Sequence, residues 1–297
     1  MAPPRDEEAL SEVVGFVLLL GVIVLALSVY QVYAVPAQGR ENEIMHMNLV
    51  KDRFTDYKIA LDSLWVNNAT GVTLSMAFDL GSGSATTTGS GLSIPLLSPV
   101  GSSGAVSVAS GGSVLTITAD SDEQEIPLGS LQYVSGNNYW VDQTWTYEMG
   151  GVFLTQTGGT TVRVSPPFSV YNTGGNASVS ITPVNITGSS LLAGSGPVRI
   201  ESRLRNMPPY ANITGTFSAV NISIDTGDEG TARAWRRAFA AAPVREGIPT
   251  AWYEVSPESS LSSGVAWIRI DGSDHVTLLA ERADYLVSIA TSASLIE

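Results

Sequence analysis

The chain has 297 residues, and its 15 Lys and Arg against 28 Asp and Glu give a formal net charge of −13. The absence of cysteine excludes disulfides, iron–sulfur clusters, thiol nucleophiles and cysteine-ligated zinc. The acidic balance argues against a nucleic-acid partner, because binding to phosphates needs clustered Lys and Arg.

A long apolar segment lies near the N-terminus. Residues 13–35 read VVGFVLLLGVIVLALSVYQVYAV and contain no charged side chain. At 1.5 Å per residue a helix of this length crosses the ~30 Å hydrocarbon core of a membrane. Tyr30 and Tyr33 follow near its end, where aromatic side chains favour the membrane interface. We predict a membrane helix over residues 10–36 rather than a cleaved secretory signal, whose apolar stretch is shorter.

The residues just before this segment form a recognisable N-terminal motif. The stretch Asp6-Glu-Glu-Ala-Leu-Ser-Glu-Val-Val-Gly15 resembles the start of archaeal type IV pilin-like surface proteins of euryarchaea. Those proteins have a short polar leader, called a class III signal peptide, and then a motif like V-S-P-V-I-G that runs into the helix. The resemblance implies that a prepilin peptidase removes residues 1–9 by cutting between Ala9 and Leu10 and leaves the helix in place.

The same resemblance implies which residues form the filament or membrane helix. They are Ser11, Glu12, Val13, Gly15, Phe16 and Leu20. In bacterial pilins a carboxylate near the mature N-terminus pairs with the terminal amine of a neighbouring subunit, and Glu12 is the candidate for that role here. The alternative, which we favour, is an ordinary acidic residue that complements the dipole at a helix N-terminus.

A helical stalk is predicted over residues 37–69. Its apolar side chains recur every three or four residues, which places them on one stripe of a helix: Met47, Val50, Phe54, Tyr57, Leu61 and Leu64. The stripe is either a seam between copies of the chain or a surface that docks on the protein's own β domain. Fewer than three heptads favours docking. Pro36 and Gly39 predict a kink or break between the membrane helix and the stalk.

Residues 70–297 predict a secreted, β-rich domain. Short segments of alternating polar and apolar residues separated by Gly, Ser and Asn turns are typical of a β-sandwich or barrel-like fold. The predicted strands are 72–80, 114–119, 139–148, 152–155, 161–164, 178–183, 198–205, 217–225, 265–271, 276–280 and 285–290. Residues 81–113 are rich in Gly, Ser and Thr and predict a long exposed loop or a mobile insertion, with room for a short strand. Residues 228–242 predict one short helix that Pro243 ends.

The predicted fold class is therefore mainly β with a long N-terminal α-helix. A single transmembrane helix is extended by an outer amphipathic helix and is followed by an extracellular β-sandwich-like domain with one short helix. Five N-x-[ST] sequons lie beyond the membrane helix, where an exported chain exposes glycosylation acceptors: Asn68, Asn176, Asn185, Asn212 and Asn221. We expect some of them to carry sugar.

Motifs of catalysis are missing from the sequence. It has no H-E-x-x-H, P-loop, dinucleotide-binding or nucleophile-elbow motif, and only two histidines, His46 and His275. The acidic stretches 120–125 and 225–229 are candidates for calcium, but turns and helix capping explain them more simply. Arg233, Arg236 and Arg237 form a small basic cluster that more simply balances nearby acids. We expect no enzymatic activity, no cofactor and no bound metal.

The sequence leaves two functions open. The first is a non-enzymatic cell-surface structural protein, a pilin-like subunit of a type IV pilus-type filament or a minor pilin. The second is a single-pass, membrane-anchored adhesin that binds a surface or a glycan and does not polymerise. Exposed tryptophans would serve the second function as stacking platforms, although core packing is their commoner role: Trp140, Trp145, Trp252 and Trp267.

Overall fold

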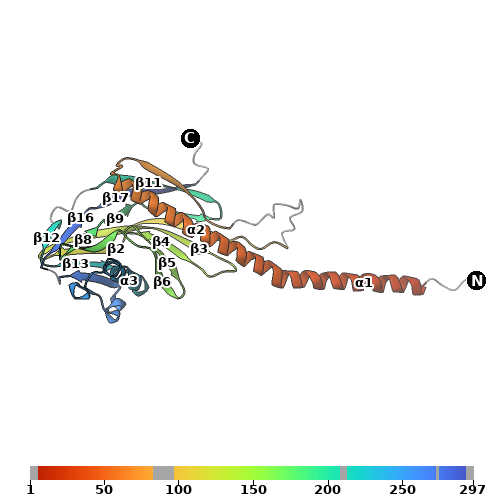
Figure 1. Ribbon diagram of the computed structural model, residues 1–297. Coiled ribbons are helices and arrows are strands. Elements are labelled where there is room, and N and C mark those ends of the chain that lie inside the picture. Colours follow the sequence, from red (N-terminus) through yellow and green to blue (C-terminus); the bar gives the residue numbers. More distant parts are fainter. Residues whose placement is uncertain (1–5, 83–96, 208–212, 272–273, 292–297) are drawn as a thin grey trace, which may run out of the picture.

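The computed structural model describes residues 6–82, 97–207, 213–271 and 274–291 of the chain. It begins with one long helix that projects away from a β-rich domain (Figure 1). The helix comprises α1 (Asp6–Val29), a π-helical turn, η1 (Tyr30–Ala34), and α2 (Val35–Val66). The predicted fold class, a mainly β protein with a long N-terminal helix, is confirmed.

The helix continues through the position where the sequence predicts a kink or break. Pro36 lies in the first turn of α2, and proline has no N–H to donate to the preceding turn. The chain passes this point through η1, in which the N–H of Val35 donates to the carbonyl of Tyr30, one residue further back than in an α-helix. Figure 1 shows a change of direction between α1 and α2. The helix therefore bends near Pro36 without ending there, and it continues as regular α-helix through Gly39.

The strands of the β domain follow in chain order: β1 (Thr73–Asp79), β2 (Ser103–Ala119), β3 (Asp122–Gly136), β4 (Thr144–Glu148), β5 (Gly151–Gln156), β6 (Gly159–Val164), β7 (Phe168–Thr173), β8 (Asn176–Ile181), β9 (Val184–Thr187), β10 (Ser190–Gly194), β11 (Pro197–Asn206), β12 (Gly215–Phe217), β13 (Val220–Asp225), β14 (Tyr253–Val255), β15 (Val265–Ile270), β16 (Val276–Ala280) and β17 (Ala283–Thr291). A third helix, α3 (Glu229–Arg245), separates β13 from β14.

Three sheets build the domain. The largest has the order β14-β15-β13-β2-β3-β4-β5-β6, and β10 pairs with β2 beside it. A second sheet has the order β1-β11-β17-β9, and a third has the order β12-β16-β8-β7. Most pairs are antiparallel, whereas β16 with β8 and β17 with β9 are parallel. The long hairpin of β2 and β3 lies in the middle of the large sheet and connects its two halves.

A bulge in β2 divides the large sheet. The register with β3 shifts between Ala109 and Ser113, at a run of small residues that includes Gly111 with a φ of +81°. Before the bulge β2 pairs with β10, and after it β2 pairs with β13. Two separate hydrophobic cores form on the two sides of this point.

The first core lies under the half of the large sheet that contains β13, β15 and the part of β2 after the bulge. There α3 and the β12-β16-β8-β7 sheet cover the inward side chains of β2, β3, β13 and β15. Trp235 and Phe239, one turn apart on α3, are fully buried and pack against Phe153 and Phe168. Asp228 caps the helix by accepting a hydrogen bond from the N–H of Thr231 at 2.7 Å. The predicted short helix is present, but Pro243 lies inside it and α3 ends at Arg245.

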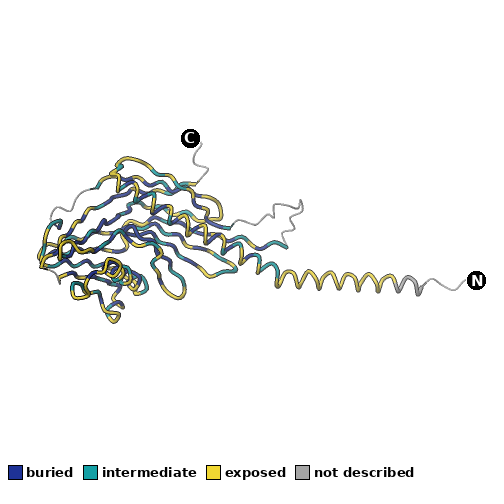
Figure 2. Tube along the Cα trace, in the orientation of Figure 1, coloured by how far each residue is buried: buried dark blue, intermediate teal, exposed yellow. Residues whose placement is uncertain are grey.

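The second core forms around α2. This helix packs against β4 and β5 of the large sheet and against β1 and β11 of the second sheet. Its stripe side chains meet aromatic and aliphatic residues of both sheets in one cluster. Figure 2 shows the contrast along the helix: α1 is exposed wherever its side chains are described, whereas buried positions recur along α2.

The sequence misplaces several elements. The predicted loop 81–113 is wrong at its end, because residues 103–113 belong to β2; residues 83–96 lie outside the described residues. The predicted strand 139–148 starts only at Thr144, and the predicted strand 217–225 is divided into β12 and β13. The sequence also missed five strands: β3, β7, β9, β10 and β14.

Glu148 is buried where the two halves of the large sheet meet. Its Oε2 accepts a hydrogen bond from the Ser113 hydroxyl at 2.9 Å, and the residue is only 7% exposed. Burial raises the pKa of this carboxyl above its ordinary value, and the hydrogen bond from Ser113 opposes the shift. The folded protein therefore holds this proton more tightly than the unfolded chain does.

This shift predicts a pH-dependent effect of Glu148→Gln. A raised folded-state pKa means that stability is greatest below the ordinary pKa of Glu and falls as pH rises through the folded-state value. Glutamine keeps the shape and cannot ionise, so the melting temperature of the variant relative to wild type should rise between pH 4 and pH 7. Thermal unfolding across that range measures it, with exposed Glu123→Gln as the control. A difference that is independent of pH would contradict the prediction.

Candidate functional site

The most unusual surface of the molecule is the apolar helix α1. Its side chains from Val13 onward are exposed on every side, from 42% at Leu27 to 67% at Val22. Within the described residues, one helix, Glu12–Val66, is long and apolar enough to cross a membrane, and none of its most apolar window is buried. A helix that is apolar all round needs a cover, either lipid or other helices.

The residues implied by the pilin-like motif lie on this helix. Ala9, Leu10 and Ser11 are within α1, in the part whose side chains are not described. Glu12, Val13, Phe16 and Leu20 are exposed, and within the described residues nothing apart from the helix's own backbone lies within 4 Å of the position that a Cβ of Gly15 would take. The structure therefore leaves this segment free to meet a membrane or another molecule.

The predicted helical stripe lies against the protein's own β domain. All six of its side chains, Met47, Val50, Phe54, Tyr57, Leu61 and Leu64, are between 0 and 9% exposed. Buried hydroxyl groups add specific links: the Tyr57 hydroxyl is 2.8 Å from the Ser202 hydroxyl, and the Tyr285 hydroxyl donates to the carbonyl of Leu61 at 2.7 Å. A stripe covered in this way is not available as a seam between copies.

A carboxylate fastens the start of α2 to the loop between β3 and β4. Glu43 is 1% exposed, and its Oε1 accepts from the N–H of Asn138 at 2.6 Å. Its Oε2 accepts from the N–H groups of Tyr139 and Trp140 at 2.8 and 2.6 Å. Hydrogen bonds from successive backbone N–H groups to a charged oxygen are among the stronger ones in proteins. We call this arrangement the Glu43 clamp.

Neighbouring side chains tighten the same junction. Gly39, one turn before Glu43, lies so close to the Tyr139 ring that an added Cβ would clash with the ring carbons. The Arg40 guanidinium lies 4.5 Å from the centre of the Trp140 ring, a cation–π contact. One turn further on, His46 Nε2 is 3.0 Å from the carbonyl of Asp79. Gly39 is therefore required for close approach rather than for a break.

The Glu43 clamp predicts a large loss of stability in Glu43→Ala. Removing the carboxylate leaves three backbone N–H groups of a partly buried loop without their acceptor, which should lower the free energy of unfolding by about 2–3 kcal/mol. Glu43→Gln should lose less, because its amide oxygen still accepts while its NH2 group faces a donor. Chemical denaturation measures both, with exposed Glu41→Ala as the control. Equal stabilities for the Glu43 and Glu41 variants would disprove a role for the clamp.

The described sequons differ in how their side chains are held. Asn68 is exposed at the end of α2. The Asn176 side chain accepts from the N–H of His275 at 3.3 Å, and Asn185 accepts from the N–H of Gly129 and donates to Asp284. Asn221 lies on β13 beside a groove, and Asn212 lies outside the described residues.

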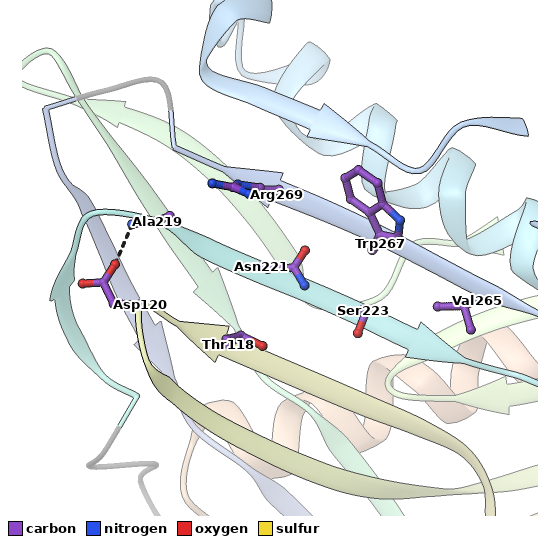
Figure 3. Close-up of a pocket in the computed structure, with 8 residues that line it drawn as sticks. All are labelled: Thr118, Asp120, Ala219, Asn221, Ser223, Val265, Trp267 and Arg269. Carbon is purple, nitrogen blue, oxygen red and sulfur yellow. Dashed lines mark hydrogen bonds between the residues drawn. The ribbon is translucent and has the colours of Figure 1, made fainter. Parts of the chain in front are cut away.

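This groove, of about 550 Å³, lies on the outer face of the large sheet where β2, β13 and β15 run side by side (Figure 3). Its side chains come from the outward positions of these strands, from the β2–β3 turn and from the residue just before β13: Thr118, Asp120, Ala219, Asn221, Ser223, Val265, Trp267 and Arg269. The inward neighbours Ile117, Ile222 and Ile268 belong to the first core, so the groove floor is rigid. The lining sets one aromatic ring, that of Trp267, among mainly polar side chains, so it is more polar than the usual small-molecule site.

The other candidate sites have structural explanations. The Asp120 carboxylate accepts from the N–H groups of Ser218 and Ala219, and Asp228 caps α3. Within the described part of the chain, no three His, Cys, Asp or Glu side chains group as metal ligands would. In the basic cluster, Arg233 pairs with Glu229 and Glu258, and Arg236 also pairs with Glu258. Of the four tryptophans considered as stacking platforms, Trp145 lies in the second core and Trp140 packs against it, Trp252 packs against the first core, and Trp267 lines the groove.

Comparison with known proteins concerns the β domain alone. No curated protein and no solved structure matches the chain. Residues 100–283 match the model of a family of unknown function, DUF7289, from just before β2 to the first residue of β17. The matched region contains the first hydrophobic core, the groove and the strands β2–β16, whereas the long helix, which supplies much of the second core, lies outside it. Because that match covers more than half of its residues, the chain belongs to the DUF7289 family.

Proposed function

We propose that the protein is a non-enzymatic, type IV pilin-like surface protein, a filament subunit or minor pilin with its β domain outside the cell. One observation carries the proposal: the chain joins a helix that is apolar on all sides to a helix locked into a folded domain. The first half, α1, is exposed, whereas the second half, α2, is held by its stripe and by the Glu43 clamp.

This arrangement suits such a protein both in the membrane before assembly and in the assembled filament. Before assembly a helix as apolar as α1 is stable in a bilayer, where its backbone groups are satisfied internally. In a filament the same surface would be covered by α1 helices of other copies. Because α2 is packed into the domain, the domain would be carried with the helix as one unit rather than on a flexible linker.

The alternative is an anchored surface adhesin that does not polymerise. It uses the same helix in the same membrane and differs only in what the β domain does. The groove beside Trp267 favours a role in saccharide recognition, since its lining combines an aromatic ring with hydrogen-bonding side chains.

N-terminal sequencing and intact mass of the protein from the surface fraction of its native host test the proposal. A mature chain that begins at Leu10 and retains the helix is expected, because a prepilin peptidase would cut after Ala9. A chain that begins after Ala34 or Ala37 would be conventionally secreted and would overturn the proposal. A chain that keeps residues 1–9 would be a plain membrane anchor and would favour the adhesin.

A further inference from the structure

The groove on the outer face of the large sheet contains a complete sequon. Asn221 and Ser223 are two residues apart on β13, so both side chains point to the outer face. Arg269 and Thr118 lie directly opposite Asn221 on the two neighbouring strands, and Trp267 lies directly opposite Ser223. Figure 3 shows Asn221 near the middle of this set of side chains.

Asn221 differs from the other sequons of the β domain that the structure describes. The amide groups of Asn176 and Asn185 are engaged in hydrogen bonds. Neither the Asn221 amide nor the Ser223 hydroxyl forms a hydrogen bond with another described residue, although Asn221 is half-buried. A polar side chain in a groove without a protein partner is open to modification and to a ligand at its own position.

The neighbours of Asn221 match the chemistry of a sugar attached there. A residue diagonally across an antiparallel pair is about 7–8 Å away, so the first ring linked to Asn221 Nδ2 would lie within reach of the Trp267 indole. The apolar face of a sugar ring can pack on that indole. Arg269 pairs through Nε with Asp271 at 2.7 Å, and its terminal nitrogens form no other ion pair with described residues, so they can donate to sugar hydroxyls.

We propose that Asn221 carries an N-linked saccharide and that the groove holds its first sugars, with Trp267 as the stacking platform and Arg269 as a hydrogen-bond donor. The inference rests on the proposed function, because only a chain carried outside the membrane meets this modification. Asn68, exposed at the end of α2 away from the groove-lining residues, is a sequon that would carry a sugar without such a cradle.

The test uses the full-length glycoprotein purified in detergent from its native host. Peptide mass spectrometry is expected to find a saccharide on Asn221. Asn221→Gln and Ser223→Ala both destroy the sequon and should each remove that mass and lower the melting temperature by about 2–4 °C. In a Trp267→Ala background the saccharide should stay attached, but its removal should no longer change the melting temperature. Trp267→Phe keeps a ring and should preserve most of the effect.

Asn68→Gln is the matched control, because loss of a sugar there should leave the melting temperature unchanged with or without Trp267. Two results would overturn the inference: an unmodified Asn221 in the mature protein, or equal effects of Asn221→Gln in the wild-type and Trp267→Ala backgrounds. Sequencing the N-terminus of the same sample separates this failure from failure of the proposed function. If Asn221 is unmodified on a chain that starts at Leu10, only the inference about the groove is rejected. If the chain starts after Ala34, the proposed filament function is rejected.

Discussion

Phe54→Ala is expected to lower the melting temperature of the protein by about 10 °C, which corresponds to about 3–5 kcal/mol of stability. Phe54 is fully buried where α2 meets both sheets, with its ring 5.5 Å from the Phe78 ring and 6.2 Å from the Trp145 ring between centroids. Alanine would leave a cavity among rigid aromatic neighbours that cannot easily collapse. Thermal unfolding of the full-length protein in detergent measures the effect.

Ile59→Ala is the matched control for this prediction. Ile59 lies on the same helix little more than one turn later, but it is 61% exposed and should change stability by less than about 0.5 kcal/mol. If both variants unfolded at the same temperature, α2 would not be docked in solution. The stripe would then be available as a seam between copies, which is the interpretation that the covered stripe now disfavours.

The sequence predicted the helices well because their signals are local. The apolar segment 13–35 and the stripe from Met47 to Leu64 each depend on residues a few positions apart, so periodicity alone identifies them. It did not decide the stripe's partner, because that depends on Phe78 and Trp145 in distant strands. Local pattern gives the apolar face of a helix, but only the tertiary fold gives what covers that face.

The errors in the β domain have identifiable causes. Residues 103–109 look like a loop because their outward positions are Ser and Ala and one inward position is Gly104. Gly104 is required there, since an added Cβ would sit 2.5 Å from the Tyr133 hydroxyl and would also clash with the carbonyl of Leu80. The start of β3 resembles an acidic turn, because Asp122, Glu123 and Glu125 are all exposed there. Composition misled the prediction wherever packing required small or charged residues.

The Glu43 clamp and the groove were beyond reach of the sequence. The partners of Glu43 lie about a hundred residues away and are backbone N–H groups, which carry no residue signature. The sequon at Asn221 was visible, as was the candidacy of Trp267 as a stacking platform. Whether Asn221 and Trp267 meet in one groove depends on the register of β13 against β15, and the sequence pattern alone does not determine that register.

Val17→Asp is expected to abolish filaments that contain this chain while the protein is still made and still reaches the membrane. Val17 is 59% exposed and lies near the start of the apolar segment. Near the bilayer edge a carboxylate can reach the interface, so anchoring should survive. In a filament core built from apolar helices the same carboxylate would be buried without a partner, which costs several kcal/mol per subunit. Electron microscopy for filaments and immunoblotting of the membrane fraction measure the two effects separately.

Ile59→Asp supplies the control, since it adds the same charge to an exposed position of α2 beyond the apolar segment, and filaments should persist. Filaments that survive Val17→Asp would mean that α1 does not form the core. Wild-type cells that hold the protein at the surface but never in filaments would favour the anchored adhesin. In that outcome α1 remains a membrane helix, and the β domain with its groove becomes the part that acts. The Val17→Asp variant therefore distinguishes a filament subunit from an anchored adhesin, because it changes one side chain in the half of the helix that the β domain does not cover.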